Sequence, residues 1–176
     1  MYGEILENVF HLELASWRAI FYGNMARPRA KLLLWNACHQ KLPTKERLLR
    51  FGLINEAKCN WCAEVETQHH LFFNCHVLRE IWAKVLKWID VDHNPLDWNK
   101  EVNWIIKEGG KKKANYRILK TAFTEALYEM WALRNRELFK NSKNNVDVLK
   151  RIEDSIVYRS WHSKKIRICI SKLLLP

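Results

Sequence analysis

Three cysteines and a histidine near the middle of the chain have the spacing of a metal site. Cys59 and Cys62 form a C-x2-C pair, His70 follows after seven intervening residues, and Cys75 follows after four more. A C-x2-C turn can place two sulfurs on one side of a metal ion, and a short loop can return a histidine and a cysteine to its other side. Zn²⁺ prefers four tetrahedral ligands of these types. The spacing therefore predicts a closed, structural zinc site with no open position for catalysis.

The histidine ligand is less certain than the cysteines, because three histidines lie close together. His69 would give spacings of six and five residues in place of seven and four. His76 directly follows Cys75 and would need an awkward turn to reach the same metal ion. We favour His70 as the fourth ligand.

The cysteines also allow other interpretations. A thioredoxin-like use of Cys59 and Cys62 would require a surrounding βαβ pattern, which the sequence lacks. A zinc deaminase combines an H-x-E motif with a later P-C-x-x-C. His11-Leu12-Glu13 supplies the first motif, but Lys58 stands where proline would precede Cys59. Unmetallated core cysteines in a decayed copy remain an alternative.

The cellular compartment bears on the chemistry of the cysteines. The first 18 residues contain early acidic side chains and no basic segment ahead of an apolar one, unlike a secretory signal. No run of about 18 apolar residues exists, so we expect no transmembrane helix and no membrane partner. We therefore expect an intracellular protein, nuclear or cytoplasmic, with reduced cysteines. Cys38 and Cys169 should be free thiols.

Composition and periodicity predict an all-α fold. The 176 residues include only 5 glycines and 4 prolines, which argues against a turn-rich β-fold and against Gly-rich phosphate loops. Residues 53–75 look irregular, and the tail from residue 166 fits either a strand or a final helix. Helical patterns cover residues 4–22, 30–40, 45–52, 77–89, 97–107, 114–140 and 146–161.

These patterns suggest two parts. We expect a small helical domain with a zinc knuckle at residues 1–95, with its core at 17–88 and its zinc loop at 59–75. A basic extension with a long helix should follow at residues 96–176. The apolar stripe from Ile118 to Trp131 should be buried in that extension.

Positive charge points to a polyanionic partner. The chain has 30 basic and 19 acidic residues, a net charge of +11, and residues 101–176 hold 17 of the basic and 8 of the acidic ones. We expect phosphate contacts from Lys111, Lys112, Lys113, Arg117 and Lys120, around a hinge formed by Gly109-Gly110 and the three lysines that follow. Arg134, Arg136, Lys140 and Lys143 form a second cluster, for which a solvated helix face is an equal alternative.

Aromatic residues are unusually frequent, with nine tryptophans in the chain. For Trp35, Trp82 and Trp88 we expect core packing. Trp61 lies at the tip of the C-x2-C turn, where it could be exposed and stack on a base.

The zinc loop lies within a longer series of motifs. These are Trp17-Arg18-Ala19-Ile20, Pro28-Arg29-Ala30-Lys31, LLLWNACHQKLPTKERLLRFGL, CNWC, ETQHHLFFNC and REIW. In this order they resemble the zinc-binding domain that follows the reverse transcriptase in LINE-type retrotransposons without long terminal repeats, which are common in plants. The resemblance covers about residues 17–88. It implies that Cys59, Cys62, His70 and Cys75 bind Zn²⁺.

The neighbours of a metal loop this short must supply its core. We expect Thr44 to cap the helix that begins at Lys45 and Gly52 to close it. Trp82 should cover the loop from the next helix. Leu48, Leu49, Leu53 and Ile54 should pack toward the loop, and Leu71, Phe72 and Phe73 should anchor it.

The sequence departs from an intact retrotransposon protein. No Tyr-x-Asp-Asp motif and no paired carboxylates suited to two-metal chemistry occur, so we expect no enzyme activity in this chain, although the intact parent would be a reverse transcriptase. We expect a module that binds RNA or DNA, with a reverse transcriptase domain as a partner in trans. The alternatives are a structural or protein-docking module and a non-functional remnant of a retroelement.

Overall fold

The computed structural model describes residues 16–109, 114–139 and 147–173. Within these ranges the regular structure is helical apart from one isolated antiparallel bridge, between Lys58 and Val65. This confirms the predicted all-α fold. None of the helices described combines the length and apolar composition of a membrane span.

The helices follow the predicted patterns closely. In chain order they are the 3-10 helix η1 (Ser16–Ile20), α2 (Pro28–Cys38), α3 (Lys45–Arg50), the π-helical turn η2 (His70–Asn74), α4 (His76–Trp88), α5 (Trp98–Gly109), α6 (Ala114–Phe139), α7 (Val148–Ser160) and α8 (Lys164–Leu173). The tail is therefore a helix rather than a strand.

The predicted helix over residues 4–22 is described only at its end, and there it differs. Residues 16–20 form the short 3-10 helix η1 instead of the last turns of a long α-helix. The chain then turns at Gly23, whose φ of +68° favours glycine. Gly109 is the last residue of α5, and the rest of the expected hinge, residues 110–113, lies outside the described residues.

The short helix α3 has the caps that its sequence predicts. The Thr44 side chain accepts a hydrogen bond from the backbone N–H of Arg47. Gly52 follows the helix with a φ of +68°, a conformation that favours glycine. The structure adds a third contact that the sequence did not predict. Glu66 accepts a hydrogen bond from the backbone N–H of Lys45 at 2.8 Å.

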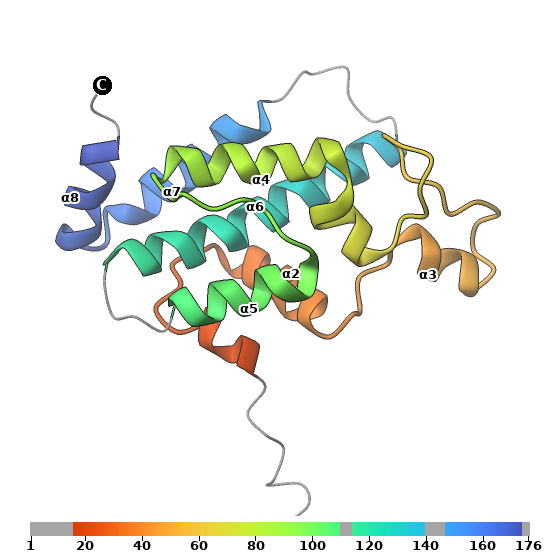
Figure 1. The fold of residues 1–176 in the computed structure, drawn as a ribbon, viewed down its shortest axis with the longest axis horizontal. Helices are drawn as coiled ribbons and strands as arrows, with labels where there is room; N and C mark the ends of the chain where they lie inside the picture. Colours follow the sequence, from red (N-terminus) through yellow and green to blue (C-terminus); the bar gives the residue numbers. More distant parts are fainter. Residues whose placement is uncertain (1–15, 110–113, 140–146, 174–176) are drawn as a thin grey trace, which may run out of the picture.

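Helix α6 is the central element of the fold. It is about 39 Å long at 1.5 Å per residue, and it contacts α2, α4, α5, α7 and α8. In Figure 1, α3 and the zinc loop lie at the end of the molecule where α6 terminates. The first turns of α6 and helix α8 lie together at the opposite end.

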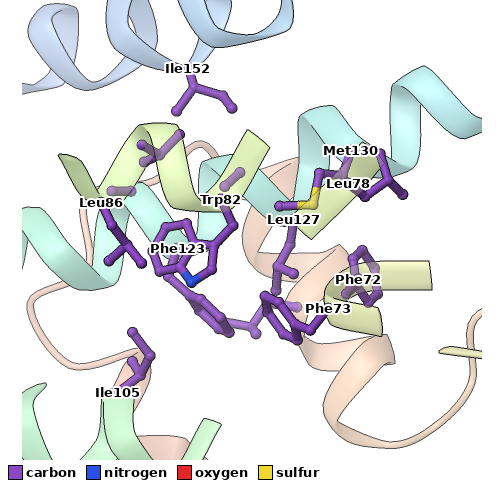
Figure 2. Close-up of a cluster of buried hydrophobic side chains, with 14 of the residues drawn as sticks. Phe72, Phe73, Leu78, Trp82, Leu86, Ile105, Phe123, Leu127, Met130 and Ile152 are labelled. Carbon is purple, nitrogen blue, oxygen red and sulfur yellow. The ribbon is translucent and has the colours of Figure 1, made fainter. Parts of the chain in front are cut away.

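The core joins the zinc loop to the C-terminal helices through aromatic rings (Figure 2). The ring of Phe123 on α6 stacks on Phe73 of η2 at 6.1 Å between centroids, and it meets Trp82 of α4 edge-on at 5.6 Å. All three side chains are fully buried. The buried cluster thus crosses the predicted boundary at residue 95, and the division into 1–95 and 96–176 stays a prediction.

Some predicted core residues are exposed instead. Trp35 points away from the α2 face that packs on the core and lies against the ring of His39. Leu49 and Leu53 are also exposed, so they do not pack toward the zinc loop as expected. The cause lies in α3, whose six residues are too few to cover the loop and none of which is fully buried.

Candidate metal centre

The four predicted ligands form one compact cluster. The sulfurs of Cys59, Cys62 and Cys75 and a ring nitrogen of His70 all lie within 4.8 Å of one another. The Cys59 and Cys75 sulfurs are 3.9 Å apart, and the Cys62 sulfur lies 3.1 Å from His70 Nε2. A tetrahedral Zn²⁺ with Zn–S bonds of 2.3 Å separates two sulfurs by about 3.8 Å. Both the donor set and the spacing therefore fit Zn²⁺.

A tight backbone turn presents the first two cysteines. The backbone N–H of Cys59 donates to the carbonyl of Glu64 at 2.9 Å, and that of Glu66 donates to the carbonyl of Ala57 at 2.7 Å. These two bonds pair the strands of chain on either side of the C-x2-C turn. The turn that they close carries Cys59 and Cys62 to the cluster.

A π-helical turn presents the other two ligands. The backbone N–H of Cys75 donates to the carbonyl of His70 at 2.7 Å, which closes the wide turn of η2. The backbone N–H of His70 donates to the Thr67 hydroxyl at 3.0 Å. Leu71, Phe72 and Phe73 are fully buried between the two ligands, as predicted, so the core fixes this half of the site.

The structure separates the neighbouring histidines. Only His70 joins the cluster in the part of the chain that the structure describes. His69 Nε2 lies instead 3.4 Å from the side-chain nitrogen of Gln40, and His76 is exposed at the start of α4. The arrangement supports His70 as the ligand.

Burial controls the protonation of the cluster without metal. It raises the pKa of the Cys59 thiol to about 12, with the nearby Cys75 adding to the effect. Burial also lowers the pKa of His70, which favours the neutral imidazole that binds metals. The Cys59 thiol must therefore lose a proton on binding Zn²⁺, whereas His70 is already in its binding form at neutral pH.

Comparison with known families identifies the segment that carries this cluster. Residues 3–82 match the family described as zinc-binding in reverse transcriptase. This segment is therefore similar to the zinc-binding domain of reverse transcriptase, and we call residues 3–82 the zinc-binding domain. The match confirms the resemblance found in the sequence, but it does not bear on a plant origin. It ends within α4, so helices α5 to α8 lie outside the matched residues. No curated protein and no solved structure matches the chain.

The expected nucleic-acid contacts lie in different places. Lys111, Lys112 and Lys113 fall outside the described residues. Arg117 is exposed on the first turns of α6, and its Nε donates to the carbonyl of Gly23 at 3.1 Å. Trp61 is half-buried against the core rather than exposed. It belongs to the zinc loop, which lies away from that end of α6 in Figure 1.

Lys120 has a structural position rather than the surface position that we expected. Its side chain is only 5% exposed, and its ammonium group donates to the backbone carbonyls of Ala19 and Tyr22. Burial lowers its pKa. The residue lies on the face of α6 that covers η1, so it has no free side toward a phosphate.

Arg134 is likewise buried rather than part of a basic surface. It bonds to both carboxylate oxygens of Glu66, which precedes the π-helical turn of the zinc-binding domain. The two residues are 68 positions apart in the chain. No local pattern could reveal this contact, and Glu66 was not among the predicted site residues.

Proposed function

We propose that the chain is a zinc-stabilised module that binds RNA or DNA through basic groups on its C-terminal helices. In this proposal Zn²⁺ has a structural part, because three cysteines and a histidine complete its coordination. Zinc bound by the cluster holds the loop between α3 and α4. A reverse transcriptase domain, acting in trans, is the proposed protein partner.

The distribution of charge carries the proposal. Of the 8 acidic residues in 101–176, Glu101, Glu125 and Glu129 are fully buried. Arg27 pairs with Glu125 and Glu129, and Glu101 accepts hydrogen bonds from Trp82 and Leu96. Of the 17 basic residues in the same range, only Lys120 and Arg134 are buried among those described. Among the described residues of this range, ten basic and five acidic side chains are therefore not buried, and this excess of positive charge favours a polyanionic ligand.

The charge of the zinc loop favours a structural rather than a phosphate-binding part for it. Three thiolates with one Zn²⁺ carry about one negative charge in total. The comparison identifies only a zinc-binding domain in this chain and no catalytic domain. We therefore propose a binding module without catalytic activity of its own.

The test is a salt-dependent titration with the zinc-loaded full chain. Labelled single-stranded RNA, single-stranded DNA and duplex DNA are titrated at two salt concentrations. Lys111, Lys112 and Lys113 are then changed together to Ala. If all three contact phosphate, the slope of log affinity against log salt should fall by about 3 on duplex and somewhat less on single strands.

A matched control separates a local contact from a general charge effect. Lys84 and Lys87 on α4 and Lys100 on α5 are exposed, so their change to Ala removes the same charge elsewhere. An equal loss of affinity in both triple variants would contradict a phosphate contact at Lys111, Lys112 and Lys113. Unchanged binding in the first variant would remove the hinge lysines from the proposal.

A docking module is the second candidate. Leu32 and Trp35 are exposed one helical turn apart on α2, where an apolar partner surface could cover them. This function gains support if the wild-type chain binds no nucleic acid. The double change Leu32→Ser with Trp35→Ser should then reduce binding to a separately expressed reverse transcriptase domain.

A further inference from the structure

Two large aromatic side chains stay exposed where α7 turns into α8. Tyr158 is 68% and Trp161 66% exposed. The reason lies in the periodicity of α7, which buries Val148, Ile152 and Ile156 against the core and directs Tyr158 elsewhere. Trp161 follows as the residue that caps the helix. Neither ring contributes much to the core, so both remain accessible to a partner outside the fold.

Positive charge surrounds these rings. Residues 155–173 contain five basic side chains and no acidic one: Arg159, Lys164, Lys165, Arg167 and Lys172. Arg159 faces Glu125 on α6 at 3.6 Å. The other four are exposed, and no carboxylate of the described residues forms an ion pair with them.

One of these cations lies directly against an exposed ring. The guanidinium carbon of Arg167 is 5.4 Å from the centre of the Trp161 ring. Such a pair offers a flat surface for a nucleobase beside a fixed charge for its phosphate. Bases present their faces in this way only where they are unpaired.

The arrangement fits a nucleic acid better than a membrane. Helix α8 buries Ile166 and Ile170 in the core, so its apolar face is already covered. Among the described residues of α8, the large apolar side chain that is exposed to solvent is Ile168. A helix that binds a membrane surface needs a free apolar face, which α8 lacks.

The position agrees with the proposed function. Helix α8 packs on α6. The C-terminal end of α7 lies at the same end of the molecule as the first turns of α6 (Figure 1). These turns of α6 carry the exposed Arg117. The zinc cluster lies toward the opposite end. A strand that crosses the α7–α8 corner could therefore continue toward Arg117.

From these observations we infer that the α7–α8 corner is a binding site for single-stranded nucleic acid. Trp161 stacks on an unpaired base, Tyr158 offers a second stacking surface, and Lys164, Lys165 and Arg167 contact the neighbouring phosphates. The inference rests on the proposed function and adds the form of the ligand, single-stranded rather than duplex.

A cavity within the zinc-binding domain, lined by α3 and the residues just before η2, is the main alternative binding site. It has a volume of about 530 Å³, and its lining includes Arg47, Arg50 and Phe51. Phe51 is 64% exposed, much like Trp161. The cations there are already engaged, because Arg50 pairs with Glu46 and Arg47 donates to the Gln40 carbonyl. Phe51 is thus a matched aromatic control for Trp161.

The test uses the zinc-loaded full chain with a labelled 12-nucleotide single strand, as DNA and as RNA, and with a duplex. Trp161→Ala should weaken single-strand binding roughly 5- to 150-fold without changing the salt slope. Trp161→Phe should retain most of the affinity, and Phe51→Ala should change little. Duplex binding should be nearly the same in all three variants. Unchanged thermal midpoints verify that each variant is folded.

Several results would overturn the inference. A change below twofold in Trp161→Ala, an equal loss on duplex, or a loss in Phe51→Ala instead would each exclude stacking at the corner. Binding to phosphatidylserine vesicles that depends on Trp161, with unchanged oligonucleotide binding, would assign the corner to membranes. If the wild-type chain binds no oligonucleotide, the proposed function fails as well. If the wild-type chain binds oligonucleotides but Trp161→Ala does not change the affinity, the proposed function is retained and the site at the α7–α8 corner is excluded.

Discussion

Glu66 and Arg134 join the zinc-binding domain to the longest helix through a buried ion pair. Arg134 Nε lies 3.0 and 3.2 Å from the two carboxylate oxygens of Glu66, and both side chains are almost completely shielded from water. The same carboxylate accepts the backbone N–H of Lys45 at the start of α3. One side chain therefore connects α3, the approach to the metal site and the end of α6.

Removing one partner of this pair should destabilise the fold. Arg134→Ala leaves the Glu66 carboxylate buried without its partner, which should lower the free energy of unfolding by about 3–5 kcal/mol. Replacing both residues with apolar ones, Glu66→Leu with Arg134→Met, should cost less than Arg134→Ala alone. Urea denaturation measures both. Lys84→Ala, which breaks an exposed pair with Glu80, is the control and should have little effect.

The metal cluster predicts one Zn²⁺ per chain. Cys62→Ser and His70→Ala should each abolish stoichiometric zinc, whereas His69→Ala should retain it, because His69 lies outside the cluster. Structural zinc sites contribute roughly 10–16 kcal/mol of apparent binding free energy, so a chelator should unfold at least residues 53–76. Metal analysis and hydrogen exchange measure these effects. A purified chain that is folded through this segment without zinc would refute the site.

Zinc affinity should fall as the pH falls. Burial holds the pKa of the Cys59 thiol at about 12 in the metal-free site, so binding must displace its proton. Protons therefore compete with Zn²⁺, and the apparent Kd should rise between ten- and about a thousandfold per pH unit lost, for one to three displaced protons. Burial lowers the pKa of His70, which reduces the competition of protons for that ligand. Competition with a chromophoric chelator at pH 7.5 and 6.5 measures the slope, and a flat profile would contradict this account.

The ring of Phe123 should be among the most costly to remove. It packs on both Phe73 and Trp82, so Phe123→Ala should cost about 3–5 kcal/mol of stability. Trp131, which we expected to be equally buried, is only half-buried on the same helix. Trp131→Ala should therefore cost less. Equal costs in thermal or urea unfolding would show that the stripe from Ile118 to Trp131 is buried throughout.

Lys120 should affect stability rather than affinity for nucleic acid. Lys120→Ala leaves the carbonyls of Ala19 and Tyr22 without their donor, at a cost of about 1–3 kcal/mol. The exposed Arg117, one turn earlier, provides the contrast, since Arg117→Ala should reduce the salt slope with little loss of stability. If Lys120→Ala lowers the salt slope without loss of stability, Lys120 contacts phosphate and the structural part assigned to it is wrong.

Features encoded in neighbouring residues could be predicted from the sequence. The ligand spacing from Cys59 to Cys75, the Thr44 cap and the periodic pattern of α4 each depend on a few adjacent positions. Backbone geometry translates such spacing directly into local structure. For the same reason the absence of acidic residues after Asp154 is visible in the sequence.

The tertiary structure alone decided which side chains are buried and which partners they have there. Lys120 and Arg117 lie one turn apart on α6 with equal charge, yet packing against η1 buries the first and leaves the second exposed. The sequence around Arg134 is compatible with a surface cation, and only the contact with Glu66, 68 residues away in the chain, shows that it is buried and paired. Burial and ion pairing depend on which surfaces meet across the whole chain, and no local pattern of residues contains that information.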